Sequence, residues 1–252
     1  MAVHSILPPE LTDAVAEVLD HAGVRHVAHG DRDHVAAATA AVDDPAARAV
    51  IGPFRSRAVA EAVEVTAPAG LPLLAPVATW AGVTRDDEPG CDDHPADHRG
   101  TVFRMVARDT VVAQRMAERL AGRRALVVAG DHEYGLQLDG QLRMAGLARA
   151  DTASDADVIV LAGLVGEPEN ERVRALAPLP VIAFDGIQGE SFPDQDVTIA
   201  LAYAPGPTGV PEARRAAEIV ARADGLDAIR AAGFDAHGDP LDPLVRFERY
   251  AL

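Results

Sequence analysis

The sequence of 252 residues contains no lysine, and all 23 of its basic residues are arginine. This absence excludes chemistry that depends on a lysine amine, such as Schiff-base formation. The only cysteine is Cys91, so no disulfide can form within the chain. The formal net charge of −16 argues against a nucleic acid or an anionic membrane as partner, because both require a basic surface.

Long apolar stretches are also absent. No run approaches the roughly 20 residues that a membrane-spanning helix needs. Residues 1–9 lack the basic segment, the apolar segment and the cleavage site of a secretory leader. We therefore expect a protein that is cytoplasmic as written, or extracytoplasmic if a leader has been removed. Aromatic residues make up only 4% of the chain against 48% hydrophobic residues, which predicts an aliphatic core.

Motifs that hold cofactors or catalyse reactions are missing. The sequence has no Gly-x-Ser-x-Gly nucleophile turn, no phosphate loop with its lysine, and no Gly-x-Gly-x-x-Gly after the first expected strand. Cys91, His94, His98 and three aspartates lie together in the polar stretch 84–100, but their spacing matches no established zinc pattern. We expect neither a cofactor nor a metal. For the polar group between His29 and His34, we expect a helix-capping role.

Several short apolar runs are each followed by a polar residue. Unbroken runs of this length predict strands that are buried on both faces, as in a parallel sheet covered by helices. In such sheets ligands bind beyond the carboxyl ends of the strands. The runs and the polar residues that follow them are 49–52 with Ser56, 71–75 with Thr79, 125–129 with Tyr134, and 181–184 with Asp185.

Strand and helix patterns alternate along the chain, which predicts an α/β protein with two doubly wound lobes. We expect lobe 1 to comprise residues 1–104 and 204–241, and lobe 2 to comprise residues 105–203 and 242–252, joined by three crossing segments. The expected strands are 2–7, 24–28, 48–52, 71–75, 102–106, 125–129, 157–161, 180–184, 199–203 and 244–248. The expected helices are 10–22, 34–42, 57–67, 110–121, 134–146, 169–176 and 212–223.

The polar residues at the strand ends form a possible ligand site. Ser56 follows a Gly-Pro turn and is expected to be a helix N-cap, where unpaired N–H groups can bind a carboxylate. On this evidence alone, a purely structural cap is the favoured interpretation. Thr79 offers a second hydroxyl on an adjacent strand end. Tyr134 could pack against a ligand or lie in the core. Asp185 suits an ammonium group, with an Asx turn or N-cap as the alternative.

Residues 50–84, together with Phe103-Arg104, Tyr134-Gly135 and 234–239, resemble type I periplasmic binding proteins, in particular the branched-chain amino-acid group. This chain is shorter than is typical of that family. The resemblance implies two lobes that close over a ligand in the cleft between them. It further implies that Ser56, the backbone of Val77 and Thr79 hold the ligand carboxylate, and that Tyr134 and Asp185 approach from the second lobe.

The resemblance also places Leu164 where a ligand-packing aromatic residue is common. We therefore expect non-catalytic binding of a small amino acid or a similar zwitterion, as in the substrate-binding protein of an ABC-type uptake system with a permease partner. Two alternatives remain open at this stage. One is a cytosolic sensor of the same fold that signals to a regulatory partner protein. The other is an enzyme that uses His132, Tyr134 and Asp185 in the cleft.

Overall fold

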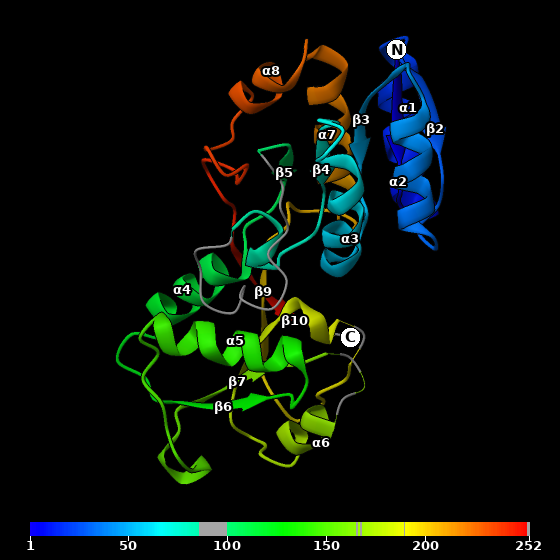
Figure 1. Ribbon diagram of the computed structural model, residues 1–252. Helices are drawn as coiled ribbons and strands as arrows, with labels where there is room; N and C mark the ends of the chain where they lie inside the picture. Colours follow the sequence, from blue (N-terminus) through cyan, green and yellow to red (C-terminus); the bar gives the residue numbers. More distant parts are fainter. Residues whose placement is uncertain (86–99, 165, 167, 189, 251–252) are drawn as a thin grey trace. The chain divides into compact units, whose positions relative to one another are not determined.

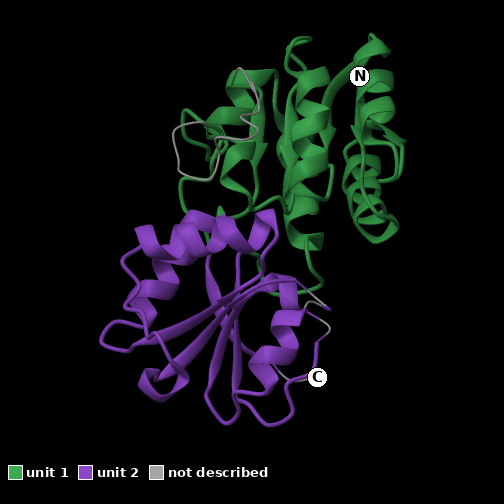
Figure 2. Ribbon diagram, turned by 60° about the horizontal axis from the view of Figure 1, so that its bottom comes forward, with its two compact units in different colours: residues 1–108, 203–244 green, residues 109–202, 245–252 purple. Residues whose placement is uncertain are grey.

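The computed structural model describes residues 1–85, 100–164, 166, 168–188 and 190–250. The chain divides into two compact units, which Figure 2 shows in different colours. Unit 1 comprises residues 1–108 and 203–244, and unit 2 comprises residues 109–202 and 245–252. The chain therefore passes from one unit to the other three times.

Unit 1 is built on a parallel sheet with the strand order β2-β1-β3-β4-β5. Its strands are β1 (Ala2–Ser5), β2 (Arg25–Ala28), β3 (Ala47–Ile51), β4 (Leu73–Ala75) and β5 (Val102–Arg104). Its helices are α1 (Pro9–His21), α2 (His34–Asp43), α3 (Ser56–Thr66), α7 (Val210–Arg222) and α8 (Leu226–Ala231), with a short 3-10 helix η1 (Ala81–Val83).

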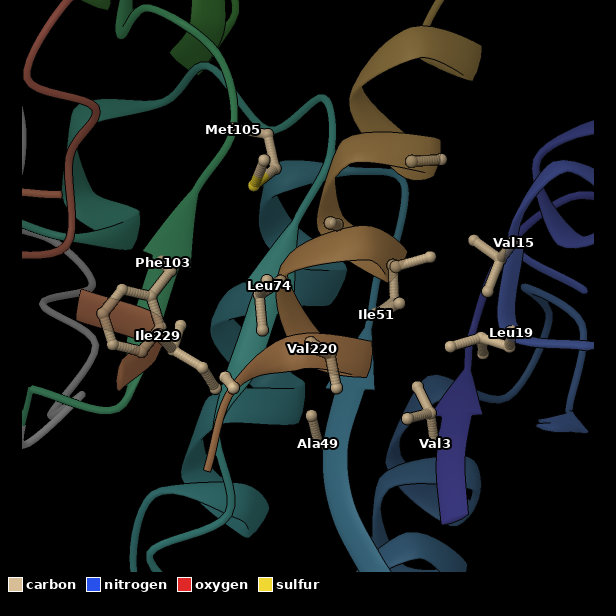
Figure 3. Close-up of a cluster of buried hydrophobic side chains, with 14 of the residues drawn as sticks. Val3, Val15, Leu19, Ala49, Ile51, Leu74, Phe103, Met105, Val220 and Ile229 are labelled. Atoms are coloured by element: carbon tan, nitrogen blue, oxygen red, sulfur yellow. The ribbon is translucent and has the colours of Figure 1, made fainter. Parts of the chain in front are cut away.

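Both faces of this sheet are buried, as the unbroken apolar runs predict. Successive strand residues point to opposite faces, so Ile51 packs in one core and Val50 in the other. Figure 3 shows the first core, in which strand residues such as Val3 and Leu74 share one cluster with Leu19 of α1 and residues of α7. The second core lies against α2 and α3. Burying each large aliphatic side chain contributes about 1.5–3 kcal/mol.

Unit 2 repeats this plan with the strand order β10-β9-β8-β7-β6. Its strands are β6 (Ala125–Ala129), β7 (Val158–Ala162), β8 (Val181–Phe184), β9 (Val197–Leu201) and β10 (Arg246–Tyr250), of which only β10 is antiparallel. Its helices are α4 (Asp109–Arg119), α5 (Glu133–Met144) and α6 (Pro168–Arg174), with 3-10 helices η2 (Ala153–Asp155) and η3 (Asp185–Ile187). In Figure 1, α4 and α5 lie side by side, and α6 lies apart from them.

The expected fold class is confirmed, and each strand and helix expected from the sequence is present within a few residues of its expected bounds. Asp33 accepts a hydrogen bond from the N–H of Ala36 at 3.0 Å, which confirms the capping role expected for its group. Helix α8 was not expected from the sequence; it has six residues, and Ile229 is its only buried side chain. A single buried apolar residue cannot show the repeated spacing from which a helix is predicted in a sequence. None of the described helices is long and apolar enough to cross a membrane.

Candidate functional site

The carboxyl ends of β3 and β4 bring two of the expected site residues together. These strands are hydrogen-bonded neighbours, so the segments that follow them begin side by side. Ser56 opens α3 after β3, and Thr79 lies in the loop after β4. The Ser56 hydroxyl accepts a hydrogen bond from the N–H of Trp80 at 3.3 Å, which joins the two segments.

The expectation that Ser56 is an N-cap is wrong. The N-cap position belongs to Arg55, whose backbone is extended and whose side chain makes no capping hydrogen bond. Ser56 is the first helical residue, and its hydroxyl is directed to Trp80 instead. The N–H groups in the first turn of a helix have no partner within the helix. At α3 these groups therefore stay available to an acceptor from outside the chain.

The loop from Val77 to Thr79 adds a second set of donors to this strand end. The backbone N–H groups of Val77, Ala78 and Thr79 donate no hydrogen bond to any described residue. All three side chains are buried. Backbone N–H groups in buried regions nearly always have a partner. A carboxylate placed here would supply acceptors for these groups and for the Thr79 hydroxyl.

A buried arginine, Arg104, is hydrogen-bonded to this loop. Arg104 is fully buried at the end of β5. Its guanidinium donates to the carbonyl oxygens of Ala78 at 2.7 Å and Ala81 at 3.2 Å, and to the Thr84 hydroxyl at 2.8 Å. It also donates to the Asp239 carboxylate at 3.1 Å. In the sequence, Arg104 and Asp239 contribute only to the family resemblance, although a charged residue inside an apolar run signals a buried ion pair.

Asp239 supplies the negative charge for this network. Its carboxylate also accepts hydrogen bonds from the Arg85 and Arg108 side chains, both at 2.9 Å, and from the Thr84 hydroxyl at 2.6 Å. Burial alone would raise the pKa of Asp239, but the Arg104 charge, the hydrogen bonds and the Arg108 charge lower this pKa to about 2. Asp239 is therefore ionised at every physiological pH.

In unit 2 the expected residues lie at the carboxyl ends of β6, β7 and β8, which are consecutive neighbours in the sheet. Tyr134 is in the first turn of α5, Leu164 follows β7, and Asp185 begins η3 directly after β8. Leu164 is 40% exposed, and its carbonyl oxygen accepts a hydrogen bond from the Asn170 amide at 2.9 Å. A side chain at Gly186 would come within 2.5 Å of the Gly163 carbonyl oxygen, so β7 and β8 can end this closely only with glycine there.

The electrostatic environment of Asp185 favours the neutral acid. Burial and the nearby Asp109 carboxylate raise the pKa of Asp185 to about 7, and hydrogen bonds from the N–H groups of Asp185 and Gly186 offset only part of this effect. Burial and the same two carboxylates raise the pKa of Tyr134 well above its ordinary value. A cationic group placed here would therefore be attracted by Asp185 and would stabilise its ionised form.

Asp109 belongs to this region as well, although it was not among the site residues expected from the sequence. Helix α4 begins at Asp109, and the Asp109 side chain is buried. Its influence on the pKa values of both Tyr134 and Asp185 places it in the same electrostatic environment. The sequence feature that could have identified Asp109 is its position, because it is a carboxylate at the start of the helix that follows the first crossing between the units.

His132, the candidate base of the enzyme hypothesis, has a structural role. Its Nδ1 atom accepts a hydrogen bond from the N–H of Gly135 at 3.3 Å, which makes His132 the N-cap of α5. Its ring also stacks on that of Tyr134, with the ring centres 6.4 Å apart. One of the two ring nitrogens is therefore committed to the helix.

The group around His94 and His98 lies outside the described residues. Among the residues that the structure does describe, no cluster of histidine, cysteine or acidic side chains could hold a metal ion.

Comparisons with known proteins place this geometry in a known fold. The sequence matches no protein-family model and no curated protein. Among solved structures, an ABC transporter substrate-binding protein from Desulfitobacterium hafniense, in complex with leucine, has a TM-score of 0.77 and 18% identity, over 100% of this chain and 97% of that chain. The leucine-binding protein LivK from Thermotoga maritima has a TM-score of 0.69 and 16% identity, over 100% and 98% of the two chains.

A third similar structure is the branched-chain amino-acid transporter substrate-binding protein LivJ from Streptococcus pneumoniae, in complex with isoleucine. Its TM-score is 0.67 at 15% identity, over 95% of this chain and 93% of that chain. Likenesses of this extent at such low identity show the fold and not the ligand. The chain therefore has the fold of the type I periplasmic binding proteins.

Proposed function

We propose that this protein binds a small amino acid, or a similar zwitterion, without covalent chemistry. The observation that carries the proposal is the complementary chemistry of the two sets of strand ends. Unit 1 offers N–H and hydroxyl donors at Ser56 and at Val77 to Thr79, which suit a carboxylate. Unit 2 offers Asp185, which suits an ammonium group.

The similar structures support the same class of ligand. Two of them contain leucine or isoleucine, and a third is described as a leucine-binding protein. We assign Tyr134 and Leu164 to contacts with the rest of the ligand, because they stand at the strand ends next to Asp185. Leu164 supplies an exposed apolar surface that suits an aliphatic side chain.

We also infer a role as the substrate-binding protein of an ABC-type uptake system, with a permease as its partner. The three similar structures are substrate-binding or leucine-binding proteins, and two of them are described as belonging to ABC or branched-chain amino-acid transporters. Reconstitution of amino-acid uptake with an ABC-type permease whose gene neighbours that of this chain would test this role. A neighbouring regulatory gene and no uptake would contradict it.

Ligand binding is tested by thermal unfolding in the presence of L-leucine, other amino acids, leucinamide and 4-methylpentanoate. A ligand that binds only the folded protein stabilises it by about 2.7 kcal/mol at a concentration of 100 times its Kd. We expect amino acids to raise the melting temperature. Leucinamide lacks the carboxylate and 4-methylpentanoate lacks the ammonium group, so each should raise it far less.

The variant Asp185→Ala should abolish the response to amino acids, because it removes the partner of the ammonium group. Asp131→Ala is the matched control, since Asp131 is an exposed aspartate in the turn before α5. The control should respond like the wild-type protein. An unchanged affinity of Asp185→Ala for L-leucine would show that the ammonium site is assigned to the wrong residue.

A further inference from the structure

The segment that would bind the carboxylate has little regular structure of its own. Between the end of β4 and the start of η1, the N–H groups of Val77, Ala78 and Thr79 make no hydrogen bond with described residues. Apart from the N–H of Trp80, which donates to the Ser56 hydroxyl at 3.3 Å, the segment must be held by its carbonyl oxygens and its side chains. Two of those carbonyl oxygens, of Ala78 and Ala81, accept hydrogen bonds from Arg104.

Arg104 can lie in the core only because a distant segment neutralises its charge. An unpaired buried guanidinium would cost several kcal/mol. The turn at 234–240 follows α8 and lies against β5, where the N–H of Arg104 donates to the carbonyl oxygen of Gly238 at 2.8 Å. Gly238 has a positive φ of 88°, and a side chain there would come within 1.9 Å of the Val102 carbonyl oxygen. This close approach brings the Asp239 carboxylate to the Arg104 guanidinium.

We propose that Arg104 and Asp239 are positioning residues, which determine carboxylate affinity by fixing the Val77–Trp80 loop without touching the ligand. The proposal rests on the proposed function, because it concerns the same carboxylate site. The guanidinium of Arg104 bonds four groups at once: two loop carbonyl oxygens, the Thr84 hydroxyl and the Asp239 carboxylate. A lysine ammonium has three donors and no planar geometry, so it cannot replace all four bonds.

Arg108 provides a matched control for Arg104. Both arginines donate to the Asp239 carboxylate, Arg104 at 3.1 Å and Arg108 at 2.9 Å. Only Arg104 also donates to the carbonyl oxygens of the loop. The variants Arg104→Lys and Arg108→Lys both keep the positive charge and both weaken the contact with Asp239. A difference between them therefore reports on the loop.

Trp80 gives a readout that needs no ligand. It is the only tryptophan of the chain, it is buried, and it lies between the two residues whose carbonyl oxygens Arg104 holds. We expect Arg104→Lys to shift the emission of Trp80 to longer wavelengths and to increase its quenching by acrylamide. Arg108→Lys should leave both properties as in the wild-type protein. Acrylamide is neutral, so the net charge of −16 does not repel it.

Calorimetric titration with L-leucine and with leucinamide then measures the effect on the site. We expect Arg104→Lys to bind L-leucine about tenfold more weakly while its affinity for leucinamide stays unchanged, because only the carboxylate contacts depend on the loop. Arg108→Lys should retain the preference for L-leucine. A general loss of structure would weaken both ligands alike, so the ratio of the two affinities separates positioning from destabilisation.

If Arg104→Lys does not fold, Thr84→Val is the second variant. Its side chain has nearly the same shape but cannot bond Arg104 and Asp239, which the Thr84 hydroxyl contacts at 2.8 and 2.6 Å. For Thr84→Val we expect smaller changes of the same kind in the Trp80 emission, in its quenching and in the preference for L-leucine. The proposal would be overturned if Arg104→Lys or Thr84→Val kept the emission, quenching and ligand preference of the wild-type protein. It would also be overturned if Arg108→Lys changed these properties as much as Arg104→Lys does. If the wild-type protein binds no amino acid, the proposed function fails, and the Trp80 measurements still decide whether Arg104 fixes the loop.

Discussion

Two aspartates in the two units have pKa values that are shifted in opposite directions. Asp239 in unit 1 is surrounded by Arg85, Arg104 and Arg108, and its pKa falls to about 2. Asp185 in unit 2 stands near another carboxylate, and its pKa rises to about 7. Burial raises the pKa of both, so the neighbouring charges decide the direction.

The two aspartates differ in what their charge does: Asp239 neutralises neighbouring arginines, whereas we propose that the carboxylate of Asp185 binds a cation. In unit 1 the carboxylate is saturated by arginines, and the proposed carboxylate site consists of backbone N–H groups and hydroxyls. In unit 2 burial and the Asp109 carboxylate raise the pKa of Asp185, which makes the protein less stable at neutral pH than at acidic pH. Groups held in such an unfavourable environment are typical of functional sites. Three experiments would test this contrast.

The largest effect is expected for Asp239→Ala. It leaves the fully buried Arg104 without its counter-charge, and breaking a buried ion pair in this way costs about 3–5 kcal/mol. Urea unfolding followed by the fluorescence of Trp80, which lies in unit 1, measures this loss. Glu17→Ala is the control, because the ion pair of Glu17 with Arg214 is exposed and should contribute at most about 1 kcal/mol. Equal losses in both variants would show that Asp239 has no special structural role.

The second-largest effect is expected for Asp185→Asn, and it is a gain in stability rather than a loss. The folded state holds the Asp185 proton more tightly than the unfolded state, so this group's contribution to stability is lost as the pH rises towards about 7. Above pH 7 the neutral amide should therefore stabilise unit 2 by about 1–2 kcal/mol, after allowance for the partial exposure of Asp185. Near pH 4 the difference should vanish.

Urea unfolding followed by far-UV circular dichroism reports on both units, and subtraction of the Trp80 transition isolates unit 2. Asp131→Asn serves as the control, since Asp131 is exposed and should show no such gain. A loss of stability in Asp185→Asn above pH 7 would show that the carboxylate of Asp185 is structural rather than held for a ligand.

The sequence predicts the parts of this contrast that depend on local pattern. Apolar runs identify the buried strands, and consecutive parallel strands bring Ser56 and Thr79 to one end of the sheet. The same reasoning puts Asp185 directly after β8. Each inference needs only the period of a strand and the rule that ligands bind at the carboxyl ends of parallel strands.

The parts that the sequence does not predict depend on contacts between distant segments. Arg104 and Asp239 are separated by 135 positions, and their pairing follows from the close approach of Gly238 to β5. The effect of Asp109 on Asp185 likewise depends on where α4 packs. The N-cap prediction for Ser56 failed because its hydroxyl is directed to the next strand end, a choice that the local sequence does not reveal.

The smallest effect is a difference between the units in how stability depends on pH. In unit 1, burial and neighbouring imidazoles hold the pKa values of His26 and His29 below 6.5, so below this pH the unfolded chain takes up protons that the folded unit resists. The His4 and His29 rings share a hydrogen bond of 2.8 Å, which cannot persist when both are protonated. Acidification from pH 7.5 to 5.5 should therefore lower the stability of unit 1, whereas it should stabilise unit 2 through Asp185. The two urea transitions should move in opposite directions, and His29→Gln should flatten the response of unit 1 alone. Parallel shifts of both transitions would mean that the contrast between the units does not arise from these groups.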